Sequence, residues 1–252
     1  MQPISAHEAR ARVLVVAERL ETEVLRLEAT RDSRATFAFT YKTMTLRIAA
    51  ALEGDSGMDP AWCARIVELF AERFFVASAA WDSGGTLPAG WAYILDALAH
   101  RRTSVLEEMV LGMAAHILYD LPLAVVELTE EGVDLEATLR DYHRMNDVLG
   151  DSIDAIQAEV AARYQPHLAF LDVLVGNQDE ILSNYGIRLS RGMAWYNAKR
   201  LLDTDAREAV EASIARAPEA LAKALMEPAI AGWLFRLIRW FSALFRRWPA
   251  PA

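Results

Sequence analysis

The sequence predicts an all-α fold, a single multi-helix domain, and three observations carry that prediction. Apolar residues recur at helical spacing along the chain, and no alternating strand pattern of useful length interrupts them. Helix-favouring Ala, Leu, Glu and Arg are abundant, whereas the 252 residues include only 12 Gly and 9 Pro. Hydrophobic residues make up 54% of the chain and charged residues 24%, so the chain can bury a sizeable core.

The first part of the chain predicts four helices, over about residues 5–30, 34–52, 59–82 and 88–101. Apolar stripes at helical spacing define each of them. Asp59-Pro60 is a clear start signal, because an N-cap aspartate precedes a proline at the first helical position.

The central stretch, from Thr103 to about Glu131, contains the most apolar segment before the C-terminus, Gly112 to Val126. A helix here would be apolar nearly all round, so we expect it to be buried and kinked. It carries His116 and Asp120, whose spacing places both on one face. Pro122 lacks a backbone N–H, so it should kink or end the helix near Asp120. A broken, buried helix with two polar side chains at the break is the candidate site, because buried polar groups need partners.

The second half predicts further helices over about residues 134–149, 152–163, 166–176, 178–202 and 204–216. Gly150-Asp151-Ser152 is expected to be a short break. We therefore divide the chain into a helical domain, residues 1–216, and a C-terminal amphipathic helix within residues 217–252.

The C-terminal segment differs in charge from the rest of the chain. From Ala229 to Ala252 it holds four arginines and no acidic residue. Projected as a helix, the arginines fall in one wedge, opposite a wide face rich in Trp and Phe. This pattern predicts a helix over about residues 229–248 that binds anionic bilayers or buries its apolar face in a second copy, as a homodimer. The alternative is a helix folded back onto its own core. The arginines are Arg236, Arg239, Arg246 and Arg247.

Composition also excludes some classes of protein. The formal net charge of −9 argues against nucleic-acid binding as the main role. The single cysteine, Cys63, excludes an internal disulfide framework and a cysteine-rich zinc site. The N-terminus shows no basic region followed by an apolar run, so the expected location is cytoplasmic, with peripheral membrane association through the basic helix.

Two pairs of residues have the spacing of metal ligands on a helix. His116 and Asp120 form one pair, and His143 and Asp147 form the other. On facing helices the two pairs could hold a divalent metal such as zinc, iron or manganese. The alternative is that His116 and Asp120 bond each other, while the second pair faces water.

Other polar and aromatic positions complete the candidate site. Asn146 interrupts an apolar stripe, so we expect it to meet a buried polar partner, with His116 or Asp120 the natural choice. His116, Asp120 and Asn146 are therefore the candidate catalytic residues. The candidate substrate-binding residues are Tyr41, Tyr142, Arg191 and Trp195.

Four pieces of sequence, taken in order, carry a family resemblance. They are Phe37 with Tyr41, the run from Gly112 to Ala124, Asp141-Tyr142 with Asn146 and Leu149, and Ala194-Trp195 with Ala198. Together they resemble the bacterial domain-of-unknown-function family 5995, over roughly residues 30–203, and the run His-Ile-x-x-Asp-Leu-Pro-Leu-Ala is the specific element. The resemblance implies a mostly helical domain and no established reaction.

Two hypotheses about function follow. The first is an enzyme that acts on a small apolar or lipid-like substrate at a membrane surface, with His116 as general base or metal ligand and Asp120 orienting it. The second is a non-enzymatic helical binding or scaffold protein, in which the polar cluster only fixes the kink at Pro122.

Overall fold

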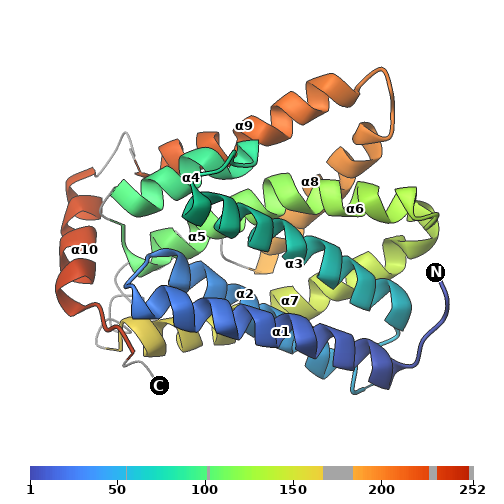
Figure 1. Cartoon of the computed structure of the whole chain (residues 1–252), viewed down its shortest axis with the longest axis horizontal. Helices are drawn as coiled ribbons and strands as arrows, with labels where there is room; N and C mark the ends of the chain where they lie inside the picture. The colour runs from blue at the N-terminus through green and yellow to red at the C-terminus, as the bar shows by residue number, and fades with distance from the viewer. Residues whose placement is uncertain (55, 101–102, 167–183, 227–231, 250–252) are drawn as a thin grey trace.

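The computed structural model describes residues 1–54, 56–100, 103–166, 184–226 and 232–249, with the side chains of 232–235 left out. All regular structure in these ranges is helical, which confirms the all-α prediction (Figure 1). The helix expected at 166–176 and the start of the one expected at 178–202 lie outside the described residues.

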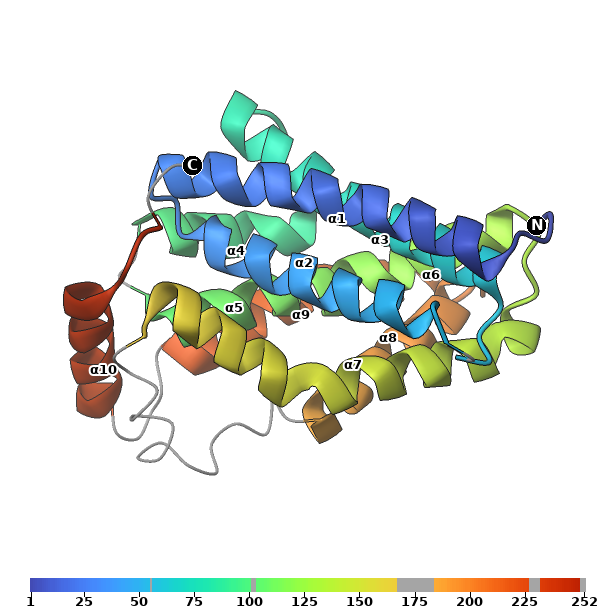
Figure 2. The ribbon, with the colours of Figure 1, turned by 90° about the horizontal axis from the view of Figure 1, so that it is seen from below.

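The first four helices are α1 (Ala6–Ala29), α2 (Arg34–Ala51), α3 (Pro60–Ser83) and α4 (Ala89–His100). Their bounds follow the expected ones closely. The Asp59 carboxylate caps α3 by accepting from the Trp62 N–H at 2.9 Å. Figure 2 shows α1 and α2 running side by side along the length of the molecule.

The central stretch forms α5 (Val105–Ala115), a π-helical turn η1 (His116–Asp120) and α6 (Leu121–Glu130). The Leu121 N–H bonds to the His116 carbonyl, one residue further along than in an α-helix. The predicted kink is thus a π-turn followed directly by α6, which starts with Pro122 in its first turn. The whole stretch is long and apolar enough to cross a membrane, but 83% of its apolar window is buried inside the fold, as in the core helix of a globular domain.

Gly112 lets α2 approach the central helix closely. A Cβ atom at Gly112 would lie 2.2 Å from Cγ of Phe37, a separation that real Cβ atoms do not show. Because Phe37 packs here, its ring and that of His116 come to 5.6 Å between centroids.

Two expected breaks are absent from the second half. Helix α7 (Leu135–Tyr164) runs unbroken through Gly150-Asp151-Ser152, where we expected it to stop. Gly150 serves tertiary packing instead, since a Cβ there would lie 2.5 Å from Oδ1 of Asn184 at the start of α8 (Asn184–Leu201).

Helix α9 (Arg207–Met226) likewise passes through the boundary that we placed after residue 216. Its buried stripe recurs every fourth residue without interruption and includes a proline, so the apolar face continues where we expected an end. The stripe is Val210, Ile214, Pro218, Ala222 and Met226.

Helix α10 (Gly232–Phe245) lies across one end of the long helices (Figures 1 and 2). Two of the four C-terminal arginines, Arg239 and Arg246, face the core, contrary to the expected orientation, whereas Arg236 and Arg247 are exposed. The Arg239 guanidinium bonds to both oxygens of Glu107, at 2.6–3.0 Å, and Arg246 pairs with Glu108. These two glutamates are buried in the first turn of α5 and need cations nearby, so they draw Arg239 of α10 and Arg246, just after it, inward.

The apolar face of α10 consequently points outward over the described part. Leu237 is 42% exposed, Trp240 51% and Leu244 60%. Trp240 is therefore not buried against the first helices, as the folded-back alternative required. Trp233 lies outside the described side chains.

Candidate functional site

An apolar cavity of about 40 Å³ lies beside the π-turn, between α2, α3, α7 and α8. Most of its wall is aliphatic, aromatic or methionine side chain. Four polar side chains also reach it, namely Tyr41 and Thr45 from α2, His116 from the π-turn and Arg191 from α8. The Thr45 hydroxyl is satisfied, because it donates to the Tyr41 carbonyl at 2.9 Å.

His116 and Asp120 bond each other, as one of the two interpretations of their spacing required. His116 Nδ1 lies 2.9 Å from Oδ2 of Asp120, and the same oxygen accepts from Nε1 of Trp91 at 2.8 Å. Because a carboxylate oxygen only accepts, the imidazole proton lies on Nδ1, and Nε2 keeps its lone pair. Burial lowers the pKa of His116 from its ordinary value, although Asp120 acts in the opposite direction. His116 is therefore a neutral base in a fixed tautomer.

Aromatic rings hold the imidazole in place. The Phe70 ring stacks on it with 3.5 Å between centroids and 10° between planes, and the Tyr41 ring meets it edge-on at 4.4 Å. This enclosure leaves His116 only 2% exposed. The imidazole is therefore shielded from bulk water on the cavity side.

Three buried polar atoms at this cavity have no hydrogen-bond partner among the described residues. They are His116 Nε2, the Tyr41 hydroxyl and one terminal nitrogen, Nη2, of Arg191. Each such atom costs about 1–3 kcal/mol when it stays unsatisfied in a dry interior. Burial raises the pKa of Tyr41 well above its ordinary value, so its hydroxyl keeps the proton. The cavity thus offers one acceptor, one hydroxyl and one cationic donor.

Arg191 is held by neutral groups. Its Nε donates to Oδ1 of Asn146, and its guanidinium lies over the Tyr142 ring, 5.1 Å from the centroid. The Tyr142 hydroxyl in turn donates to the Arg191 carbonyl at 2.6 Å. Burial lowers the pKa of Arg191 from its ordinary value. Among the described residues, no carboxylate forms an ion pair with it.

The predicted catalytic and substrate-binding residues are thus divided between two layers. His116, Tyr41 and Arg191 line the cavity, and Asp120 orients His116. The expected partner of Asn146 was His116 or Asp120, but its side-chain oxygen bonds Arg191 instead. The supporting layer behind Arg191 consists of Asn146, Tyr142 and Trp195, whose ring lies 4.5 Å from that of Tyr142.

Sequence reasoning missed Phe70 and Trp91 as site residues. In the sequence, nothing distinguishes Phe70 from the other apolar residues of α3. Trp91 carried a weak signal, because a buried indole N–H usually finds an acceptor. The pattern alone did not indicate that this acceptor is Asp120 on another helix.

The second His-x-x-x-Asp pair does not join the first. His143 and Asp147 are exposed on α7, and Asp147 pairs with Arg188. No group of three or more His, Cys, Asp or Glu side chains able to hold a metal occurs in the described ranges. The ligand set that the two pairs could have supplied for zinc, iron or manganese is therefore not assembled there. His116 Nε2 alone does not fit such an ion.

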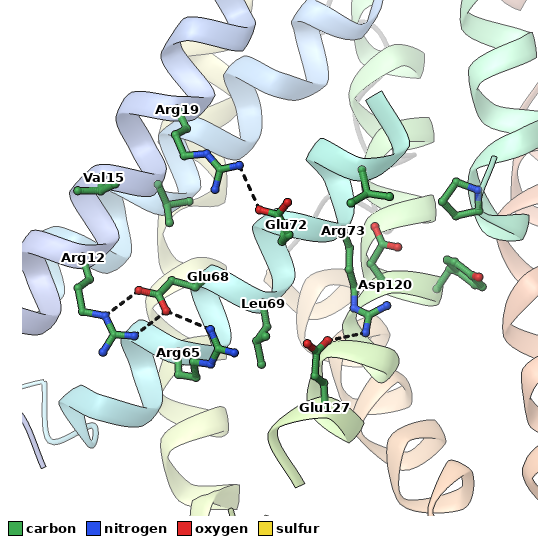
Figure 3. Close-up of a pocket in the computed structure, with 14 residues that line it drawn as sticks. Arg12, Val15, Arg19, Arg65, Glu68, Leu69, Glu72, Arg73, Asp120 and Glu127 are labelled. Carbon is green, nitrogen blue, oxygen red and sulfur yellow. Dashed lines mark hydrogen bonds and ion pairs between the residues drawn. The ribbon is translucent and has the colours of Figure 1, made fainter. Parts of the chain in front are cut away.

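On the outer side, a groove of about 710 Å³ runs between α1 and α3 towards the π-turn (Figure 3). Ion pairs bridge its walls, including Arg12 with Glu68 and Arg73 with Glu127. Asp120 lies at the inner end of this groove, while His116 lines the cavity behind it. The His–Asp pair therefore lies between the ion-paired outer groove and the apolar cavity.

Comparison with known proteins shows the family of this chain. The model of a family of unknown function, DUF5995, matches residues 13–228, so the chain belongs to that family. The matched region is wider than the span we expected and includes most of α1 and all of α9. No curated protein and no solved structure matches the chain.

Proposed function

We propose that this protein is an enzyme that acts on a small apolar or lipid-like molecule bound in the His116 cavity. One observation carries the proposal. Three buried polar atoms of complementary character meet one apolar cavity, and none has a partner in the described part of the chain. Apolar pockets with a few converging polar groups are the usual form of a small-molecule site.

His116 is the general base in this proposal. Its Nε2 lone pair takes a proton from an O–H or an acidic C–H of the substrate, and Asp120 stabilises the imidazolium that forms. The Tyr41 hydroxyl and the Arg191 N–H donate to a substrate oxygen on which negative charge develops. The lowered pKa keeps the base unprotonated at neutral pH.

The alternative is a binding protein without chemistry, in which the same three atoms only hold a ligand. Only the enzyme would turn over a substrate, so a measurement of turnover distinguishes the enzyme from the binding protein. We expect the protein to catalyse deuterium exchange next to the carbonyl of small ketones, or hydrolysis of short acyl esters, in a panel followed by NMR. His116→Gln should lower the rate about 100-fold or more, the usual contribution of a general base.

The matched control is His143→Gln, which removes the exposed histidine with the same spacing to an aspartate. It should retain the wild-type rate. Equal rates for the wild type and His116→Gln, or no turnover of any compound above the buffer rate, would favour the binding protein.

We propose further that this enzyme works at an anionic membrane surface, which α10 contacts. The exposed apolar side chains Leu237, Trp240 and Leu244 support this, and exposed Arg236 and Arg247 flank them in a segment without acidic residues. An apolar face next to basic residues is typical of interfacial helices.

Sedimentation with vesicles that contain phosphatidylserine tests the membrane contact. The double variant Trp240→Ser/Leu244→Ser should lose most of the bound fraction at low salt. Val76→Ser is the control, because Val76 on α3 is also 51% exposed. If the full-length protein does not sediment with vesicles but forms a dimer through α10, the partner of α10 is a second copy of the chain and not a membrane.

A further inference from the structure

The charge of Arg191 is the strongest clue to what the cavity binds. The side chain is only 3% exposed, and its described neighbours are the Asn146 amide and the ring of Tyr142, both neutral. An unpaired charge in a dry interior is costly, and an anion within hydrogen-bonding distance offsets that cost. Asp120 does not serve here, because its ion pair is with His116 and none joins it to Arg191 among the described residues.

The other two unsatisfied atoms, the Tyr41 hydroxyl oxygen and His116 Nε2, further restrict the class of ligand. Tyr41 can donate to an anion that also bonds Arg191, because both side chains line the same cavity and are close enough to interact electrostatically. His116 Nε2 carries a lone pair and therefore needs a donor. A carboxylate alone would leave this lone pair unsatisfied, whereas a hydroxyl on the same molecule would satisfy it.

We propose that the cavity binds a short hydroxycarboxylic acid. Its carboxylate accepts from Arg191 and Tyr41, its hydroxyl donates to Nε2 of His116, and its apolar chain lies among the aliphatic residues of α2 and α7. This inference rests on the proposed function, since it names the ligand class of the same site. Amines are excluded by the positive charge of Arg191, and neutral esters leave that charge unpaired.

The size of the cavity limits the chain of the acid. A volume of about 40 Å³ holds roughly three water molecules. The wall also contains Met44, Met113 and Met145, whose flexible side chains can move to admit several more carbon atoms. We therefore expect short-chain acids, since every carbon atom beyond the space of a few waters requires these methionines to move.

Calorimetric titration with three matched compounds tests the inference: α-hydroxyhexanoate, hexanoate and the methyl ester of α-hydroxyhexanoate. At neutral pH the wild type should bind α-hydroxyhexanoate most tightly. Loss of the carboxylate charge should weaken binding about 10- to 100-fold, the usual range for a buried charge-assisted hydrogen bond. Loss of the hydroxyl should have a smaller effect.

Variants link these preferences to the residues. Arg191→Met should remove the preference for the acid over its ester, Arg191→Lys should retain part of it, and Tyr41→Phe should reduce it. Arg188→Met is the control, because Arg188 lies one turn earlier on α8 and pairs with surface aspartates. If Arg191→Met does not fold, the inference is still tested by two measurements. They are the ratio of the affinities of the wild type for the acid and the ester, and the change of that ratio in Tyr41→Phe.

Two outcomes would overturn the inference. If the ester binds the wild type as tightly as the acid does, the carboxylate is not what the cavity recognises. If none of the three compounds binds, hydroxycarboxylic acids are not the ligand class. In both cases the proposed function stands or fails separately, by the His116-dependent turnover of ketones and esters.

Discussion

The two His-x-x-x-Asp pairs of this chain have the same spacing and opposite surroundings. His116 and Asp120 lie in a π-turn, 2% and 1% exposed, and are bonded to each other and to Trp91. His143 and Asp147 lie on the outer face of α7, where Asp147 pairs with a surface arginine. Spacing therefore placed both pairs on a helix face, and burial alone separates a candidate site from a solvated one.

The largest expected effect comes from removing the buried aspartate. Asp120→Ala leaves the Nδ1–H of His116 and the indole N–H of Trp91 without an acceptor in a dry interior. At about 1–3 kcal/mol for each orphaned donor, the free energy of unfolding should fall by about 2–6 kcal/mol. Urea denaturation measures this loss.

The same substitution in the exposed pair provides the control. Asp147→Ala removes only a surface ion pair with Arg188, so the change should stay within about 0.5 kcal/mol. Equal losses for the two aspartates would mean that burial does not distinguish the pairs.

The helices themselves could be predicted from the sequence because their signals are local. The stripe that includes Val13, Leu20 and Leu27 in α1 is fully buried, and Asp59 caps α3 as its position before Pro60 indicated. Gly150 misled the prediction, because its small size serves the approach of Asn184 from another helix. That reason is tertiary and leaves no local pattern.

The orientation of α10 was also beyond local reasoning. Its amphipathic pattern identified two faces and suggested that the arginines meet water or lipid. Which face docks depends on Glu107 and Glu108, more than a hundred residues earlier, whose burial demands Arg239 and Arg246. The partner of Asn146 was missed for the same reason, since an interruption in a stripe shows a need for a partner and not its identity.

A medium effect should come from the glycine that brings Phe37 close to His116. Gly112→Ala places a Cβ within 2.2–2.5 Å of three atoms of Phe37, so α2 and α5 must separate. Such overpacking costs about 1–3 kcal/mol. Thermal and urea unfolding of the variant should show this loss.

Gly192→Ala on α8 is the matched substitution, because a Cβ there meets nothing within 4 Å. It should leave stability unchanged or raise it by up to about 1 kcal/mol, through helix propensity. A Gly112→Ala protein as stable as Gly192→Ala would show that the wall around His116 yields easily.

The smallest expected effect concerns pH. Burial lowers the folded-state pKa of His116 below its ordinary value of 6.5, so the unfolded chain takes up a proton first as the pH falls. The stability that comes from the neutral imidazole is therefore fully present above pH 6.5 and declines below it, by at most about 1.4 kcal/mol per pH unit. His116→Gln should lack the part of this decline that comes from the imidazole. Groups common to both proteins, such as buried Glu108, cancel when the two stabilities are subtracted.

Urea denaturation of the wild type and of His116→Gln at several pH values above and below 6.5 measures this difference in stability, with His143→Gln as control for the loss of an exposed imidazole. If the free energy of unfolding changes with pH in the same way in the wild type and in His116→Gln, the imidazole of His116 has the same pKa in the folded and unfolded chains. Burial would then not distinguish the His116–Asp120 pair from the His143–Asp147 pair electrostatically.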